Sequence, residues 1–459
     1  MNTATALTRA GVSTVLEPGD PAYGTAVVGF DLSAPFAPDV VIDARAPTDA
    51  SSAVEVVAER GEVLSVMGAG HGRLRGLEGG VAITLRHLGG VEVDVAEHTA
   101  RVGAGATWDQ VLAETLPHGL APPCGSAPGV GVVGYLLGGG LGPLAGTIGF
   151  SSDHVRSFDI ATPSDGPIVA SEDDHADLFW ALRGGKGGFG VVTSVTIDLL
   201  EMTHVYGGGV YFSAGDAPAV LRAYAEWAPA LPGSSTASIA LLRLPPSSAL
   251  PDAIRGRHVV HVRFASMASS VEAQVQINDM GLVAQPLLDT VGNLPYAQLG
   301  TIHADPRDPL PVANGTASLT TLDADTVDAV LGAADIEADL PLANVEIRTM
   351  GPATRPGAPD ADAVGGRSAA HLLNVHAAAI PTLTDADRIR AVRSVLGAVE
   401  PWQESVTLIN FVGRANGDNA VSGSWTAAQH DRLDSIRAQH DPDSLFPYGY
   451  HGLSQSRES

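Results

Sequence analysis

The sequence of 459 residues is poor in cysteine and in positive charge. Its single cysteine excludes an intramolecular disulfide and gives no sign of an oxidising compartment. Lysine and arginine number 26 against 51 aspartate and glutamate residues, a net charge of −25. That charge disfavours nucleic acid or an anionic membrane surface as a partner. No uninterrupted apolar run reaches about 18 residues, so no membrane span is expected. Residues 1–20 lack the pattern of a signal peptide, and the expected location is the cytoplasm.

Length and composition predict a globular protein of two domains rich in turns, with 53 glycines and 31 prolines. Residues 1–35 show little pattern, and α+β alternation begins near residue 38. Longer alternating segments after residue 203 predict a second domain with an antiparallel sheet. The expected helices span 49–60, 177–182, 217–227, 384–396 and 426–439; the expected strands include 40–42, 63–66, 81–85, 91–95, 155–160, 191–199, 206–212, 238–243 and 259–264.

Three glycine-rich segments lie within the first two hundred residues, at 65–72, 129–142 and 184–190. The first follows a short β-type run and ends in Gly68-Ala69-Gly70-His71-Gly72. Closely spaced glycines let the backbone approach a ligand and leave N–H groups for phosphate oxygens. Together the segments predict a large phosphate-bearing cofactor wrapped by backbone, with His71 in contact with it.

Two better-known phosphate-binding motifs, the dinucleotide fingerprint and the P-loop, do not account for these glycine-rich segments. Residues 129–134 read G-x-G-x-x-G, the dinucleotide fingerprint. The proline-rich segment 121–128 before them is a poor buried strand, and Asp153 precedes its strand where a ribose-binding acid should end one. The third segment contains Gly185-Lys186 but no serine or threonine after the lysine, so it is not a P-loop.

Several separated segments, in this order, resemble a flavoprotein family. They are Met67–His71, Val130–Gly142, Asp177–Thr193, and Asn410–Phe411 with His440–Phe446. The chain resembles the berberine-bridge-enzyme-like branch of the vanillyl-alcohol-oxidase superfamily. The resemblance implies an α+β fold with a PCMH-type FAD-binding domain at 36–202. An antiparallel-sheet substrate domain would follow at 203–400, and a segment at 401–459 would return to the FAD domain.

The resemblance implies FAD attached covalently through His71. Its cofactor-binding positions map onto Met67, Gly68, Ala69, Gly70, Gly72, Ala127, Val130, Gly131, Val133, Gly134, Gly138, Gly139, Gly142, Gly190, Val192 and Asn410. Doubly linked relatives carry a cysteine where Ala127 stands here, so a second link through Cys124 is not expected. No metal is predicted.

The sequence departs from the family at Met67, Gly188 and Gly449, where Arg, Asn and Asn are usual. Leu408 stands where many relatives carry a tyrosine that acts as a base or binds substrate. The base must then come from elsewhere.

Glu346 and Arg348 lie on one face of a β-type segment. We expect Glu346 to be the base and Arg348 to hold a substrate oxygen, unless the two form a solvent-facing ion pair. Tyr206, His376 and Tyr448 are further substrate-binding candidates.

The expected function is an FAD-dependent oxidase acting on a small organic substrate, such as an alcohol, an amine or a secondary-metabolite intermediate. Val130 matches the family position at which oxidases tend to have valine, so O2 is expected to reoxidise the flavin and give hydrogen peroxide. A dehydrogenase with another acceptor and a non-catalytic flavin-bearing binder are the alternatives. The sequence leaves the oligomeric state open.

Overall fold

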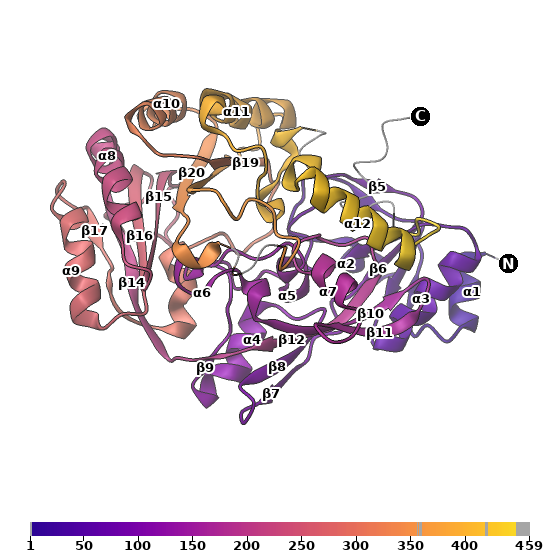
Figure 1. Ribbon diagram of the computed structural model, residues 1–459. Helices are drawn as coiled ribbons and strands as arrows, with labels where there is room; N and C mark the ends of the chain where they lie inside the picture. The colour runs from indigo at the N-terminus through magenta and orange to yellow at the C-terminus, as the bar shows by residue number, and fades with distance from the viewer. Residues whose placement is uncertain (1, 356, 358–359, 418–420, 447–459) are drawn as a thin grey trace.

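The computed structural model describes residues 2–355, 357, 360–417 and 421–446, and it contains two units side by side (Figure 1). The first unit begins with a four-stranded sheet in the order β1-β3-β6-β4, in which β3, β6 and β4 are parallel. Their bounds are Val15–Leu16, Val40–Asp43, Val81–Thr84 and Leu64–Met67. Helix α3 (Pro47–Glu59) connects β3 to β4 and buries an apolar stripe that includes Val54 and Val57.

The first unit also holds a five-stranded antiparallel sheet in the order β11-β10-β12-β8-β7. Helix α3 contacts β10, β11 and β12, so it is packed between the two sheets. The strands are β7 (Val91–Asp94), β8 (Thr99–Gly103), β10 (Val155–Thr162), β11 (Gly166–Ser171) and β12 (Val191–Asp198). Smaller elements are β2 (Phe36–Ala37), β5 (Leu77–Glu78), β9 (Leu120–Ala121), β13 (Leu200–Glu201), α4 (Trp108–Thr115), α5 (Val132–Leu136), α6 (Ala145–Ile148) and α7 (Ala176–Leu182).

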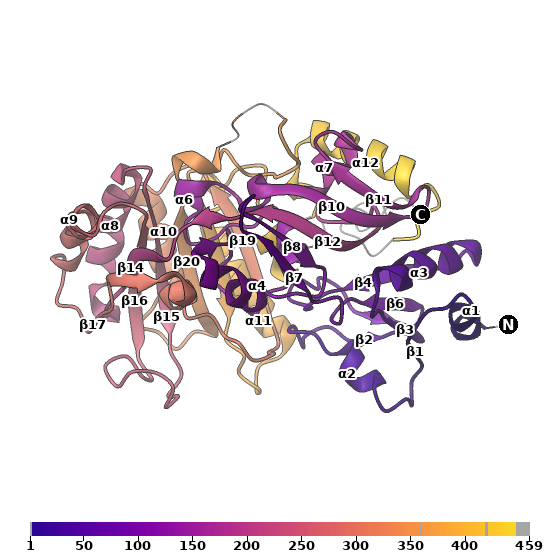
Figure 2. The ribbon, with the colours of Figure 1, turned by 90° about the horizontal axis from the view of Figure 1, so that it is seen from below.

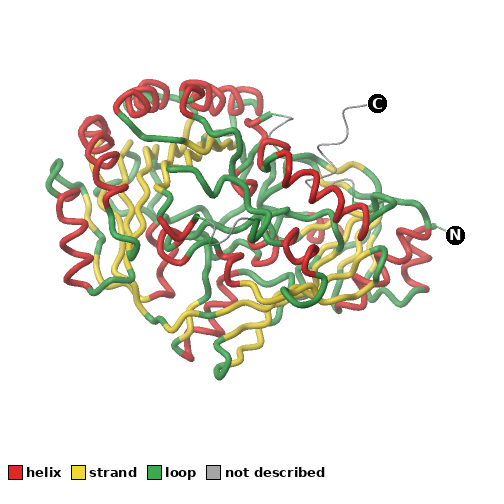
Figure 3. The backbone as a smooth tube through the Cα atoms, viewed as in Figure 1, coloured by secondary structure: helices red, strands yellow, loops and turns green. Residues whose placement is uncertain are grey.

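The second unit is an eight-stranded antiparallel sheet in the order β17-β14-β16-β15-β20-β21-β19, with β18 also paired to β14. Its strands are β14 (His204–Ser213), β15 (Ser235–Arg243), β16 (His258–Ser266), β17 (Leu288–Asp289), β18 (Gly292–Pro295), β19 (Asn314–Leu319), β20 (Leu342–Thr349) and β21 (His371–Ala377). The helices are α8 (Ala217–Trp227), α9 (Ser270–Gly281), α10 (Ala324–Ala334) and α11 (Asp385–Ala398). They cover the outer face of the sheet (Figure 3).

The two faces of this sheet differ in chemistry because side chains alternate along each strand. The face under the helices is apolar and includes Ile239, Val262, Val345 and Val375. The opposite face is turned toward the first unit and carries buried polar residues. The α+β fold with a second antiparallel sheet is therefore confirmed.

The last helix that the structure describes packs against the first unit. Helix α12 (Ala427–His440) lies beside α7 in both ribbon views (Figures 1 and 2). Arg432 forms an ion pair with Asp177 at 2.6 Å, and His440 Nδ1 lies 2.8 Å from an oxygen of Asp165. The backbone N–H of Leu64 donates to the carbonyl of Leu445.

The first 35 residues are more ordered than their sequence predicts. Helix α1 (Thr3–Arg9) buries Leu7 and packs on α3, and helix α2 (Tyr23–Val27) precedes a segment that contacts both units. The short amphipathic pattern of α1 is too brief to stand out without its packing partner. Among the helices that the structure describes, none combines the length and the apolar character needed to cross a bilayer.

Candidate active site

A cavity of about 510 Å³ lies between the two units. On one side it is lined by the glycine-rich segments of the first unit, around residues 64–74, 125–141 and 186–192. On the other side it is lined by β20, β21 and residues 305–314. A second cavity of about 250 Å³ adjoins it, and His71 and Asp305 line both.

The segment after β4 presents backbone to the main cavity. Gly70 has φ +75°, and a Cβ there would lie 2.7 Å from the Cα of Gly29, so only glycine fits. The carbonyls of Ala69 and Gly70 accept from the N–H groups of Phe30 and Asp31 at 3.0 and 3.1 Å. Within the described residues, no acceptor faces the N–H groups of Ala69 and Gly70 themselves. These N–H groups remain available to a ligand.

His71 follows this turn and lines both cavities. The Phe30 ring stacks on its imidazole, with centroids 3.9 Å apart and planes 16° apart. Burial lowers the pKa of His71 to about 4, although a hydrogen bond with the backbone of Gly129 acts in the opposite direction. The imidazole is therefore neutral at neutral pH, and one ring nitrogen keeps a lone pair that can form a bond.

The other glycine segments complete the same wall. Gly68, Gly134 and Gly187 line the cavity, and a Cβ at any of them would meet no protein atom within 4 Å. Their missing side chains leave room for a ligand lying flat against the backbone. Lys186 Nζ donates to the Gly134 carbonyl at 2.9 Å and to Asn410 Oδ1, and burial lowers the pKa of Lys186 to about 8.

The structure brings most of the predicted cofactor residues together. Those that line the main cavity are Met67, Gly68, Ala69, Gly70, His71, Gly72, Ala127, Val130, Gly131, Val133, Gly134, Gly190, Val192 and Asn410. Gly138, Gly139 and Gly142 lie behind the cavity wall. A Cβ on these glycines would come within 3.0 Å of Asn410, Val364 and the Cys124 carbonyl, respectively, so the absence of a side chain leaves room for these neighbours.

Cys124 is buried away from the main cavity, whereas Ala127 lines it. The Sγ atom of Cys124 lies 3.9 Å from Tyr296 Oη. Burial raises the pKa of the thiol to about 12, which keeps it protonated and unreactive at neutral pH. This placement supports a single attachment point.

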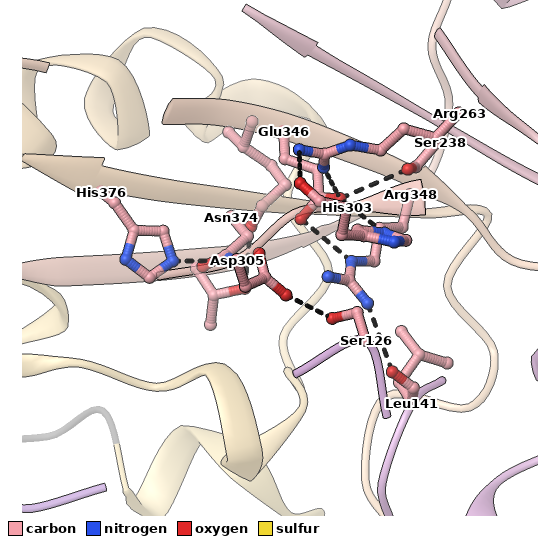
Figure 4. Close-up of polar contacts among 12 residues, drawn as sticks. Ser126, Leu141, Ser238, Arg263, His303, Asp305, Glu346, Arg348, Asn374 and His376 are labelled. Carbon is pink, nitrogen blue, oxygen red and sulfur yellow. Dashed lines mark hydrogen bonds and ion pairs between the residues drawn. The ribbon is translucent and has the colours of Figure 1, made fainter. Parts of the chain in front are cut away.

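The second unit contributes a polar strand face (Figure 4). Asn344, Glu346 and Arg348 alternate along β20, and His376 and Asn374 of β21 pair with Asn344 and Glu346. All five side chains belong to residues that line the cavity.

Glu346 lies in a buried charge cluster, so the alternative of a solvent-facing ion pair is wrong. Its Oε1 lies 2.5 Å from Arg263 Nη1 and 3.3 Å from His303 Nε2, and its Oε2 accepts from Arg348 Nε at 3.0 Å. Burial alone would raise the pKa of the Glu346 carboxyl. Arg348 and Arg263 outweigh burial, and the pKa falls well below its usual value.

Other polar atoms at the cavity have hydrogen-bonding capacity to spare. Asp305 Oδ2 accepts from Ser126 Oγ at 2.7 Å, and within the described chain its Oδ1 has no donor. His376 Nε2 lies 2.9 Å from Asn374 Nδ2. The side-chain oxygens of Asn344 and Asn374 are buried, and no described residue donates to them.

Two remaining candidates are not at this wall. Tyr206 is buried in the apolar core, and its hydroxyl hydrogen-bonds Gln274 of α9. Tyr448 lies outside the described residues. Sequence reasoning missed Asp305 and Arg263. Asp305 has no local motif, and Arg263 meets Glu346 only through the register of β15 with its two neighbours.

Known proteins resemble part of this chain in sequence. Residues 38–171 match the model of an FAD-binding domain. The FAD-dependent monooxygenase FUP4 of Fusarium proliferatum is 37% identical over 174 residues, 37% of this chain and 34% of that protein. The (R)-6-hydroxynicotine oxidase of Paenarthrobacter nicotinovorans is 32% identical over 167 residues, 36% of each chain. The chain thus spans about a third of the length of these relatives.

Solved structures resemble the whole chain. A glucooligosaccharide oxidase from Acremonium strictum, described as carrying 6-S-cysteinyl, 8α-N1-histidyl FAD, superposes with a TM-score of 0.85 and 19% identity, over 97% of this chain and 98% of that one. The 6-hydroxy-D-nicotine oxidase from Arthrobacter nicotinovorans gives a TM-score of 0.79 and 21% identity, over 95% and 97%.

The matched domain and the glycine-lined cavity define an FAD-binding flavoprotein. The chain shares its fold with structural neighbours in the berberine-bridge-enzyme-like and vanillyl-alcohol-oxidase flavoproteins, in line with the resemblance seen in its sequence. The residues present fit FAD, because unpaired backbone N–H groups and absent Cβ atoms face a cavity that a neutral histidine also reaches. No group of three or more potential metal ligands occurs in the described part of the chain.

Proposed function

We propose that this protein is an FAD-dependent oxidase that takes a hydride from a small organic substrate, an alcohol, an amine or a secondary-metabolite intermediate. The FAD would be attached through His71, and O2 would be the final electron acceptor, giving H2O2. The observation that best supports the proposal is the main cavity between the two units. His71 and the glycine segments form one wall, and a charged strand face forms the other.

Bound FAD would supply the hydride-accepting chemistry. The residues that would hold it are the cavity-lining members of the glycine segments, with His71 as the covalent anchor and Lys186 and Asn410 at the far side. The strand face would position the substrate against that wall. Because the cavity lies between two packed units, bulk water would be largely excluded from the reacting groups.

The substrate must also lose a proton, and two carboxylates reach the cavity. Both oxygens of Glu346 are engaged by arginines, and its lowered pKa makes it a poor proton acceptor. Asp305 keeps one oxygen without a donor and also faces His71. We therefore assign proton acceptance to Asp305, and we assign to Glu346 the role of orienting Arg348.

The proposal is tested on the purified protein. After acid precipitation, yellow flavin should remain in the pellet. Under anaerobic conditions, a panel of alcohols, amines and hydroxy acids should include compounds that bleach the flavin, and air should restore the colour with release of H2O2. If the bleached flavin stays reduced in air, the protein is a dehydrogenase that uses another electron acceptor. A flavin that no compound in the panel bleaches would support a non-catalytic binder.

A further inference from the structure

Arg348 is a buried guanidinium with one nitrogen to spare. The residue is only 9% exposed. Its Nε donates to Glu346 Oε2 at 3.0 Å and its Nη1 donates to the Leu141 carbonyl at 3.2 Å. Among the described residues, nothing accepts from Nη2. Figure 4 shows this nitrogen on the side of the guanidinium that is turned toward Asp305. Nη2 is not among the buried side-chain nitrogens that lack a partner, so it opens onto the cavity that Arg348 lines.

Two arginines and two carboxylates set the charge around Arg348. Arg263 and Arg348 both form ion pairs with Glu346. His261 and His303 add no charge, because burial and the neighbouring Arg263 lower the pKa of both rings. Asp305 acts on the charge of Arg348 but hydrogen-bonds Ser126 and makes no ion pair with Arg348 in the described structure. Nη2 is therefore left as a charged donor without a direct partner, which an anionic oxygen of a ligand could use.

The same wall also offers an acceptor. Within the described chain Asp305 Oδ1 has no donor, and Asp305 lines the cavity near enough to Arg348 to act on its charge. A ligand that satisfies this wall must bring a negatively charged oxygen for Arg348 and an O–H or N–H group for Asp305.

We infer that Arg348 is an anion-binding residue and that the substrate is an organic acid that bears a hydroxyl or amine group. The carboxylate would accept from Arg348 Nη2, and the hydroxyl or amine would donate to Asp305 Oδ1. The reaction assignment rests on the proposed function, whereas the binding assignment does not. In that reaction the substrate C–H would give its hydride to FAD and the O–H or N–H its proton to Asp305. A C=O or C=N bond would form, and the carboxylate would be unchanged.

The test uses the flavin-loaded protein and a pair of probes of nearly equal shape, phenylacetate and its neutral amide, phenylacetamide. Binding is followed both by the change in flavin absorption and by calorimetry. The wild-type protein should bind phenylacetate at least about tenfold more tightly than the amide. Equal affinity for the two probes would overturn the inference. Because calorimetry reports binding even in protein without flavin or turnover, a failure of the proposed oxidase activity would be seen separately.

Two variants locate the site. Arg348→Met should abolish the preference for phenylacetate, and retention of the preference would place the anion elsewhere and overturn the assignment. If that variant does not fold, Arg348→Lys keeps the charge next to Glu346 but lacks the planar fork. It should lower the preference at least about threefold, and an unchanged preference would equally overturn the assignment.

Discussion

The ring of Phe30 lies flat on the imidazole of His71, with 3.9 Å between the two centroids. Phe30 comes from the segment after α2, and His71 comes from the turn after β4. The stack fixes the plane of the imidazole, while the hydrogen bond with Gly129 fixes its rotation. The remaining ring nitrogen is thereby held in one direction before any bond to the flavin forms.

Phe30→Ala should therefore reduce the fraction of protein with covalent flavin several-fold, since the imidazole would lose its support. The fraction is measured by acid precipitation and intact mass. Phe36→Ala is the matched control, because Phe36 stacks with Arg73 and not with His71. Full attachment of the flavin in the Phe30→Ala variant would contradict this role.

A single link to the flavin is expected. His71→Ala should lose all covalent flavin, and Cys124→Ser should keep it, because the buried thiol lies outside the cavity and stays protonated. The intact mass of each variant shows whether flavin is still covalently attached. Flavin still attached in His71→Ala would show a second attachment point.

Proton acceptance by Asp305 predicts a clear contrast between two carboxylates. Asp305→Asn should slow anaerobic flavin reduction by a bleaching substrate about 10²-fold or more. Glu346→Gln should weaken substrate binding through Arg348 and lower the free energy of unfolding by about 3 kcal/mol, because two buried arginines lose their partner. Stopped-flow reduction rates and urea denaturation separate these effects. A larger loss of the limiting reduction rate in Glu346→Gln than in Asp305→Asn would return the base to Glu346.

Oxygen reactivity is expected to depend on Val130, which lines the cavity. Val130→Leu should slow reoxidation in air about tenfold or more, because a larger side chain narrows the space beside the bound flavin. The anaerobic reduction rate serves as the internal control and should stay within a few-fold of wild type. Reoxidation at the wild-type rate would show that Val130 does not govern access of oxygen.

The pH dependence of stability should carry the signature of His371. This residue of β21 is buried, with Nδ1 3.2 Å from Thr349 Oγ1, and burial lowers its pKa from 6.5 to about 4. Between these values the unfolded chain binds a proton that the folded protein does not. The free energy of unfolding therefore falls as the pH drops from about 6.5 to 4, by up to about 3 kcal/mol from this group.

His371→Asn should flatten that slope, as measured by urea denaturation near neutral pH and near pH 4.5. His118→Asn, at an exposed position, is the control and should leave the slope unchanged. An identical acid dependence in wild type and His371→Asn would rule out this contribution.

From the sequence, most residues of the glycine-segment wall of the cavity could be named, but those of the strand-face wall only in part. Gly70 and its neighbours act through local backbone geometry, which a short motif encodes. Arg348 was anticipated because strand alternation puts it on the same face as Glu346. Tyr206 was named only as a polar candidate, and in the structure it lies on the apolar face of its strand together with Val210. Asp305 and Arg263 depend on contacts far apart in the chain, which no local pattern records.

Residues 30–32 join three parts of the molecule. Phe30 and Asp31 donate to the His71 turn, Leu32 donates to the Leu310 carbonyl, and Leu310 donates back to Phe30. Two of these four bonds tie the first unit to Leu310 of the second beside His71, and swinging the units apart there would break both. We therefore expect a substrate to enter without a large hinge opening on this side. Selection by size would then take place at the entrance, before Arg348 or Asp305 makes any contact.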